Sequence, residues 1–351
     1  MEPIIAGIQQ IGIGVADAPH AFTWYRQHFG MDILMFDDVA DASLMKHYTG
    51  GQVHQRRAIL SLNLKGGAGL EIWQFKNRLP RAAPSILLGD TGISSVKIKS
   101  ADIHTSFQFL KNKKTGLLTD LTKMPDGKEH FFVRDPYHNI FEIIEDNDWF
   151  SSNHFHMGGP VGCTMGVADI DRSKKFYQEI LGYDQVIYDK ENCFNDLANL
   201  PGGKSKVRRV LLKHRDKREG TFSQLLGNSQ IELIQAMDRT PKKIYEDRYW
   251  GDLGFIHICF DIHGMNKLKE KCALHGHPFT TDSSSSFGMG KAAGHFSYIE
   301  DPDGTLIEFV ETHCIPVIKK IGWYLDLKKR NPKKPLPSWM LKALRFNRVK
   351  D

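Results

Sequence analysis

Four glutamates of this chain are each flanked by apolar residues: Glu71, Glu142, Glu232 and Glu308. His257 lies in a similar setting between Ile256 and Ile258. Carboxylates and imidazoles in such surroundings can bind a divalent metal ion or transfer protons. The same residue types also fit an ordinary alternative, in which the glutamates face solvent from a strand and the histidine is a hydrogen-bonded core residue. The elements that position these residues must decide between the two interpretations.

An internal repeat places these residues at corresponding points of the chain. At an offset of 152 residues, 11–17 (IGIGVAD) matches 163–169 (CTMGVAD), Trp24-Tyr25 matches Phe176-Tyr177, Gly30 matches Gly182, and Arg56-Arg57 matches Arg208-Arg209. A second pair of copies aligns 89–93 (GDTGI) with 251–255 (GDLGF), and Asp135-Pro136 and Glu142 with Asp301-Pro302 and Glu308. Self-similarity over this length indicates four copies of one ancestral module.

The first copy shows the order of elements within a module. Residues 8–15 alternate as a strand, and residues 18–29 have helical spacing between an N-cap at Asp17 and a terminating Gly30. Three further strands are predicted at 31–36, 57–64 and 69–75. The predicted fold class is therefore α+β, with four βαβββ modules that form two tandem domains, followed by a helical tail at the C-terminus.

The repeat also sets the domain boundaries. Domain 1 is predicted over 5–147, with modules at 5–76 and 90–147, and domain 2 over 158–313, with modules at 158–237 and 252–313. A basic extension follows at 315–351, which contains eleven Lys or Arg and two acidic residues, Asp326 and Asp351. Of the total charge of +6, the extension carries +9, so the rest of the chain carries −3. A slightly acidic body without a recognised binding module argues against nucleic acid as a partner.

The C-terminal extension and the cysteine content indicate where in the cell the protein works and whether it binds a membrane. Apolar residues among the lysines of 315–351 predict a two-helix strap over the domains rather than a stable association with a membrane. Five cysteines without regular pairing indicate neither a disulfide framework nor a thiolate zinc site. Residues 1–10 lack the features of a signal peptide, and no apolar run is long enough to cross a bilayer. We expect a cytoplasmic protein, either a monomer or a homodimer.

The modules resemble the vicinal oxygen chelate superfamily, which includes glyoxalase I, extradiol dioxygenases, methylmalonyl-CoA epimerase and bleomycin-resistance proteins. The resemblance rests on Val-Ala-Asp followed by Phe-Tyr and Leu-Gly, and on 301–308 (DPDGTLIE), and it covers residues 5–313. It implies that paired modules form a cup, and that a His or Gln on each first strand and a Glu on each last strand bind a divalent metal ion.

The resemblance assigns one first-strand ligand position to each module. These positions hold Gln10, Ser95, Gly162 and His257 in chain order. Gly162 has no side chain and Ser95 is a poor ligand, so modules two and three together would make no working site. Modules one and two would offer Gln10 with two glutamates, and modules three and four His257 with two glutamates. Modules one and four would combine Gln10, Glu71, His257 and Glu308, the set that resembles glyoxalase I.

The glyoxalase resemblance implies a lyase or isomerase that acts on a small molecule by proton transfer next to a metal-chelated carbonyl. One divalent ion is expected, with Zn, Ni, Fe or Mn as the alternatives, and Gln10, Glu71, His257 and Glu308 as metal ligands. Glu308, or Glu71 in its place, would be the catalytic base. His154 or His156 would be substitutes for the missing ligand at Gly162 if modules three and four paired.

Two other functions remain open from the sequence. A non-haem iron dioxygenase, of the extradiol or 4-hydroxyphenylpyruvate type, needs two first-strand histidines and one glutamate in one cup. Tyr298, followed by Asp301-Pro302 and Glu308, resembles the extradiol signature, but His295 lies too close to this tyrosine to fit it. The third hypothesis is a protein of the bleomycin-resistance type, which sequesters a ligand without chemistry. The lack of histidine at three of the four first-strand positions favours it.

Overall fold

The computed structural model describes residues 2–82, 85–153, 155–284, 287–289, 292–318 and 323–350. The first module contains β1 (Ile4–Gly14), α1 (Ala18–Phe29), β2 (Ile33–Asp41), a 3-10 turn η1 (Ser43–Tyr48), β3 (Gln55–Leu62) and β4 (Gly69–Phe75). The second contains β5 (Gly92–Ser100), α2 (Ile103–Asn112), the short strands β6 (Gly116–Leu117) and β7 (Thr122–Lys123), β8 (Glu129–Arg134) and β9 (Ile140–Glu145). Both follow the predicted βαβββ plan.

The second half repeats this plan. The third module contains β10 (Met157–Gly166), α3 (Ile170–Leu181), β11 (Gln185–Asn192), η2 (Asn195–Leu197), β12 (Val207–Lys213), α4 (Ser223–Leu226) and β13 (Gln230–Ala236). The fourth contains β14 (Gly254–His263), α5 (Met265–Leu274), β15 (Thr281–Asp282), β16 (Phe287–Met289), β17 (Ala292–Glu300) and β18 (Leu306–Thr312). The predicted fold class, two tandem α+β domains of this kind, is confirmed.

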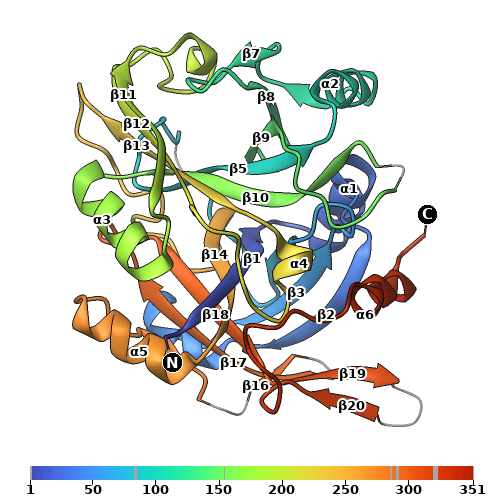
Figure 1. The fold of residues 1–351 in the computed structure, drawn as a ribbon. Coiled ribbons are helices and arrows are strands. Elements are labelled where there is room, and N and C mark those ends of the chain that lie inside the picture. The colour runs from blue at the N-terminus through green and yellow to red at the C-terminus, as the bar shows by residue number, and fades with distance from the viewer. Residues whose placement is uncertain are drawn as a thin grey trace.

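The strands of the described modules form two large curled sheets, and each sheet takes one module from each half of the chain. The first has the order β15-β17-β18-β14-β1-β4-β3-β2, and the second has the order β11-β12-β13-β10-β5-β9-β8-β6. In Figure 1 the blue β1 lies beside the orange β14, and the green β10 beside β5. We call the concave side of the β1–β14 sheet the first cup and that of the β5–β10 sheet the second cup. The halves of the sequence thus interlock in space.

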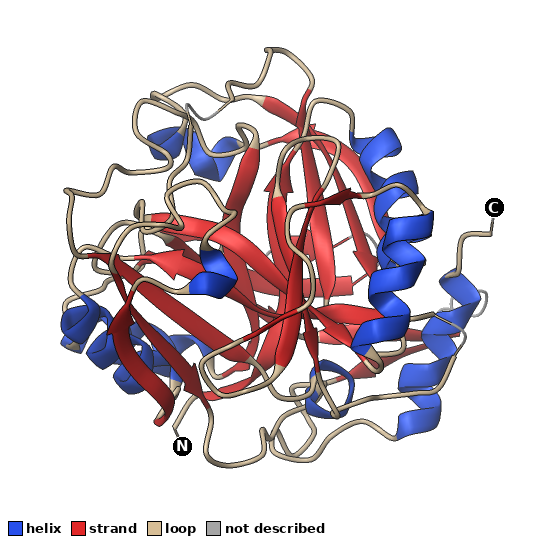
Figure 2. Cartoon of the chain, turned by 90° about the horizontal axis from the view of Figure 1, so that it is seen from above, coloured by secondary structure: helices blue, strands red, loops and turns tan. Residues whose placement is uncertain are grey.

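The helices begin at capping residues that fix where each first strand ends. Asp17 accepts a hydrogen bond from the backbone N–H of His20 at 3.0 Å, and Gly30 ends α1 in the left-handed region, as the sequence predicts. Asp102 and Asp169 cap α2 and α3 in the same way. Figure 2 shows the helices at the periphery and the strands in the centre of the molecule. The caps of α1, α2 and α3 thus share one register, whereas α5 begins at Gly264 without a side-chain cap.

Two buried Tyr–Asp hydrogen bonds connect modules within each half. The Tyr25 hydroxyl on α1 donates to Asp135 Oδ2 at 2.6 Å, and the Tyr177 hydroxyl on α3 donates to Asp301 Oδ2 at 2.9 Å. Burial and the adjacent carboxylates raise the pKa of both tyrosines well above the ordinary value, which keeps the hydroxyls as donors. The two sheets are thus joined by two equivalent Tyr–Asp hydrogen bonds, one in each half of the chain.

The basic extension differs from the predicted two-helix strap. It begins as a hairpin of β19 (Cys314–Ile318) and β20 (Trp323–Asp326), followed by α6 (Ser338–Lys342) and the 3-10 turn η4 (Ala343–Asn347). Leu327, Leu336 and Leu341 pack in one cluster with Leu60 and Leu62 of β3. Residues 314–318 are extended and pair antiparallel with β20, where the sequence predicted a helix. The extension covers one end of the first cup, which is the part of the expectation that holds.

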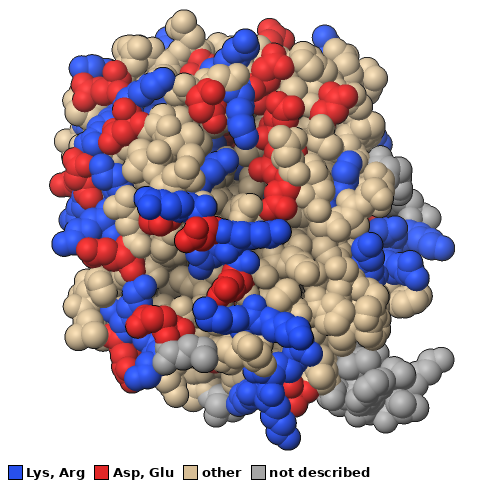
Figure 3. Space-filling model, viewed as in Figure 1, with Lys and Arg blue, Asp and Glu red and all other residues tan. Residues whose placement is uncertain are grey.

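Acidic and basic side chains are interspersed on the face of the molecule that Figure 3 shows. This face therefore has no large patch of one charge that would bind a partner of the opposite charge. Within the described residues, each helix is too short or too polar to cross a bilayer.

We predict that truncation of Leu341 weakens the whole fold because the extension is part of the core. Leu341 is buried against the β3 leucines, so Leu341→Ala should lower the free energy of unfolding by about 2–4 kcal/mol. Trp339→Ala on the same helix is the control, since its side chain is 68% exposed and should change stability by less than about 0.5 kcal/mol. Urea denaturation measures both, and equal effects would contradict this assignment.

Candidate metal centre

The four predicted ligands lie on four adjacent strands at the middle of the first sheet. Gln10 is on β1, Glu71 on β4, His257 on β14 and Glu308 on β18, and these strands are neighbours in the order β18-β14-β1-β4. β4 runs parallel to β1 and places Glu71 beside Gly12, and β18 runs parallel to β14 and places Glu308 beside Cys259. The pairing of modules one and four, one of three alternatives left open by the sequence, is the one found.

Their side chains converge. His257 Nε2 lies 3.1 Å from Glu308 Oε2 and 3.4 Å from Glu71 Oε2. Gln10 Nε2 lies 3.5 Å from Glu308 Oε2, which identifies Gln10 rather than Gln9 as the residue that faces the cluster. All four side chains are buried. The ordinary alternative of solvent-facing glutamates therefore does not apply to Glu71 and Glu308.

Gly12 makes room for the imidazole. Its Cα lies opposite His257 across the β1–β14 pair, and a Cβ on Gly12 would lie 2.3 Å from the His257 ring. Any side chain at position 12 would displace the imidazole. The sequence analysis did not single out this residue, although the repeat contained a signal: position 12 is glycine in module one and Thr164 in module three, where the ligand partner is absent.

Several buried polar atoms of the cluster have no hydrogen-bond partner and could bind a cation instead. Among the described residues, Gln10 Oε1, Glu71 Oε2 and His257 Nε2 are buried atoms that complete no hydrogen bond. Ligand atoms of Glu71, His257 and Glu308 all lie within 4.8 Å of one another. Adjacent ligands of one ion bound at about 2.0–2.2 Å are roughly 3 Å apart, so this set fits one divalent ion. Buried polar atoms without partners are uncommon, and an ion would satisfy them.

The electrostatics agree with this fit. Burial lowers the pKa of His257, but the carboxylates of Glu308 and Glu71 outweigh burial and raise this pKa to about 9. The two acids therefore create a negative potential strong enough to hold a proton on a buried imidazole. The same potential would attract a divalent cation, whose charge balances the two carboxylates.

A cavity of about 210 Å³ opens on the cluster. Both glutamates line it, together with an aromatic wall formed by Phe36, Trp73, Trp250, Phe296 and Tyr298. Arg56 is the one basic side chain among its described lining residues; it lies over the Trp73 ring and forms an ion pair with Asp38 at 3.1 Å. The Tyr298 hydroxyl lies 3.5 Å from His257 Nδ1. The centre is thus buried from bulk water but open to a small ligand.

The other candidate histidines lie elsewhere. His295 on β17 forms an ion pair with Asp282 at 2.6 Å. His156 packs against the Phe109 ring of α2, and His154 lies outside the described residues. In the second cup, Glu142 and Glu232 contact cationic side chains rather than unpaired ligand atoms. The first-strand positions of that cup hold Ser95 and Gly162.

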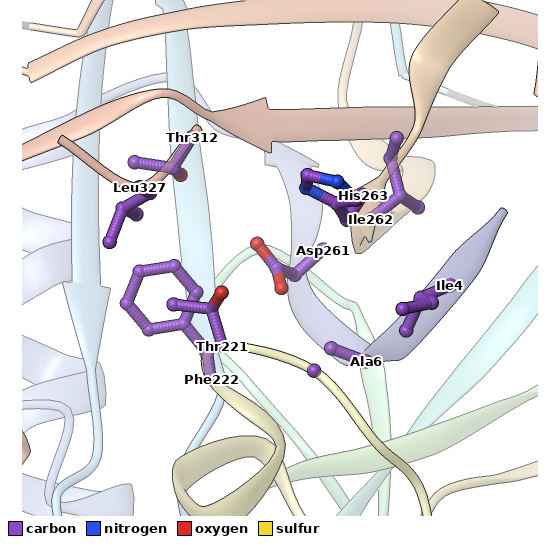
Figure 4. A pocket seen from close by; sticks show the side chains of 10 residues that line it. Ile4, Ala6, Thr221, Phe222, Asp261, Ile262, His263, Thr312 and Leu327 are labelled. Carbon is purple, nitrogen blue, oxygen red and sulfur yellow. The ribbon is translucent and has the colours of Figure 1, made fainter. Parts of the chain in front are cut away.

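A much smaller cavity, of about 10 Å³, lies at the other end of the first sheet. In Figure 4 the Asp261 carboxylate points into it between Thr221 and Thr312. Burial, with the nearby Glu311, raises the pKa of Asp261 well above its ordinary value. The space suits one water molecule and is distinct from the metal centre.

Solved structures share the fold at low sequence identity. A glyoxalase I mutant from Zea mays is 15% identical and has a TM-score of 0.56, covering 88% of this chain and 94% of that one. A proposed dioxygenase from Bacillus subtilis is 14% identical, also with a TM-score of 0.56, covering 88% of this chain and 86% of that one. No curated protein matches the sequence. At such identities the likeness concerns the fold alone.

The family model for the Glyoxalase/Bleomycin resistance protein/Dioxygenase superfamily matches residues 7–143 and 159–309. These two matches cover most of the chain and coincide with the two halves of the repeat. The two matched segments agree with the tandem module plan. The chain therefore belongs to the Glyoxalase/Bleomycin resistance protein/Dioxygenase superfamily.

Proposed function

We propose that this protein is a metal-dependent enzyme of the glyoxalase type, a lyase or isomerase that moves a proton next to the carbonyl group of a small cytoplasmic molecule. One observation carries the proposal: Gln10, Glu71, His257 and Glu308 meet at a cavity, and three of their buried polar atoms complete no hydrogen bond. Gln10, Glu71, His257 and Glu308 would hold the ion. A bound divalent ion would supply Lewis acidity toward substrate oxygens.

Access to the cavity decides which residue would act as the base and which would only bind the metal. Glu71 and Glu308 line the cavity, so their carboxylate oxygens are the groups that can reach a proton on a substrate carbon. His257 is fully buried behind them, which suits a fixed ligand rather than a proton carrier. The aromatic wall excludes water from the space in which the proton moves. Glu308, or Glu71 in its place, would therefore act as the base.

The dioxygenase alternative is less well supported by the same geometry. A facial triad needs a second imidazole, and the corresponding position holds Gln10. The Tyr298 hydroxyl beside His257 is the feature that favours it. Oxygen consumption by the Fe(II)-loaded protein with catechols or oxo acids would support the dioxygenase over a lyase. Ligand binding that survives a chelator, without turnover, would support a sequestering protein.

We predict that metal binding depends on His257. Loss of an outer hydrogen-bond partner already costs a metal site about 10- to 100-fold in affinity, so loss of the imidazole itself in His257→Ala should cost at least about 100-fold. His263→Ala is the matched control, because His263 lies on the same strand and contacts Glu311 rather than the cluster. Titration with Mn²⁺ or Zn²⁺ and elemental analysis measure both. Equal metal content in the two variants would contradict the site.

We predict that one of the two glutamates carries the proton transfer. Glu308→Gln and Glu71→Gln keep the shape of the side chain but remove the base, so the variant of the true base should exchange substrate protons about 10²- to 10⁴-fold more slowly. Deuterium incorporation from D₂O into a small hydroxy-carbonyl compound measures this rate at saturating metal. If both variants lose activity only in proportion to their lost metal, neither glutamate is the base.

We predict that turnover does not require a peptide thiol. The cavity of about 210 Å³ is smaller than the roughly 300–1,000 Å³ of sites for drug-sized ligands, so a compact substrate fits it better than a tripeptide conjugate. A small 2-oxoaldehyde or hydroxy-carbonyl compound should therefore be converted at the same rate with and without glutathione. Conversion that appears only after glutathione is added would contradict this prediction.

A further inference from the structure

The second cup retains both of its strand glutamates in the registers of the first cup. Glu142 pairs with position 97 of the parallel neighbour β5, just as Glu308 pairs with position 259 of β14. Glu232 pairs with Thr164, as Glu71 pairs with Gly12. Glu142 and Glu232 are both buried. Two carboxylates buried together need compensating positive charge, because burial of an unpaired carboxylate costs several kcal/mol.

The positively charged ammonium of Lys97 lies between the carboxylates of Glu142 and Glu232. Its ammonium contacts Glu142 Oε2 and lies 2.7 Å from Glu232 Oε2, and all three side chains are buried. Burial alone would lower the pKa of Lys97, but the two glutamates outweigh burial and raise it, so the side chain stays charged. By register Lys97 takes the position that Cys259 has in the first cup.

Other side chains of the second cup complete the ionic network. Arg209 Nε lies 2.7 Å from Glu232 Oε1, and its Nη1 lies 2.6 Å from Asp196. His130 Nδ1 lies 2.7 Å from Glu142 Oε1. His130 Nε2 lies 3.3 Å from Asp196, yet it is a buried atom that completes no hydrogen bond within the described residues. His130 thus contacts one glutamate of the pair through Nδ1, while its Nε2 faces Asp196.

The strand registers show that these cations replace neutral residues. Arg209 and Ala58 both lie two residues before the partner of the last-strand glutamate. Arg208 forms the two-point ion pair with Asp189 that Arg57 forms with Asp37, so Arg208 corresponds to Arg57, at an offset of 151 rather than the 152 found in the sequence. Arg209 is thus a substitution for Ala58 and not a second copy of Arg57.

We propose that the ammonium of Lys97 takes the place in the second cup that a metal ion takes in the first, and that removal of this side chain alone turns the second cup into a metal site. Its ligands would be the Oε2 atoms of Glu142 and Glu232, which both contact the Lys97 ammonium in the native chain. The native chain accordingly binds no ion in the second cup, which keeps its charge balance without metal.

The test compares Lys97→Ala with Lys97→Met, each in the His257→Ala background, which weakens the first centre at least about 100-fold; His257→Ala alone gives the baseline of bound Mn²⁺. Alanine removes the charge and opens space, whereas methionine removes the charge and keeps most of the volume. With 1 mM Mn²⁺, Lys97→Ala should bind one ion per chain and Lys97→Met none. Mn²⁺ should also raise the midpoint of thermal unfolding of Lys97→Ala by about 5 °C and leave that of Lys97→Met unchanged.

Two results would overturn the proposal. One is a folded Lys97→Ala chain that binds no Mn²⁺. The other is a Lys97→Ala chain that stays unfolded at 1 mM Mn²⁺ while Lys97→Met folds, since the ion would then be unable to replace the ammonium. A double variant that also carries Glu142→Gln should lose the gained ion, which locates it in the second cup. The gain is counted relative to His257→Ala alone, so the outcome does not depend on what the first cup still binds.

Discussion

Each cup of this protein buries a pair of strand glutamates, and the charge of that pair must be balanced inside the fold. Coulomb attraction at short range can offset the cost of burying an ion only if the countercharge is close and well placed. The second cup meets this condition with Lys97, Arg209 and His130 at contact distance. In the first cup, the described residues around Glu71 and Glu308 offer the imidazole of His257, and polar atoms beside it remain unsatisfied. The same requirement thus gives a closed ionic cluster in one sheet and an incomplete one in the other.

The incomplete cluster exists because the chain pairs its first module with its last. β1 and β14 are antiparallel neighbours at the centre of the first sheet, so Gln10 and Glu308 meet across 298 positions of sequence. Contacts of this range are costly to close and form late relative to local ones. The Tyr25–Asp135 and Tyr177–Asp301 hydrogen bonds join modules within each half, so in the folded chain they connect the two sheets. The position of the candidate centre therefore depends on the interlocking of the halves rather than on either half alone.

Local patterns predicted the parts of the fold that depend on local physics. Asp17 and Gly30 delimit α1 as expected, since capping and left-handed glycine are properties of a few adjacent residues. The module plan followed from alternation and repetition. The choice of partner module did not, because β1 has the same apolar alternation whether it pairs with β14 or with another first strand; only the count of ligand side chains favoured one pairing. The hairpin of 314–326 was missed since apolar residues among lysines fit a helix and a strand equally well.

The site shows the same limit at a finer scale. The register of the repeat predicted His257 and the glutamates, but not Lys97, Arg209 and Gly12. The roles of these three residues depend on contacts between strands: Lys97 reaches Glu232 from the neighbouring module, and Gly12 leaves room for the His257 ring opposite it.

These residues also explain why the two cups differ in chemistry. An ammonium donates hydrogen bonds and has no coordination position left for a substrate oxygen, and the Lys97 network is sealed from solvent. A divalent ion that prefers six ligands, such as Mn²⁺, would keep open positions beside four side chains, and the first cup has a cavity beside its carboxylates. Filling one cup with a protein cation therefore confines reactivity to the other, where the fold leaves both charge and space unsatisfied.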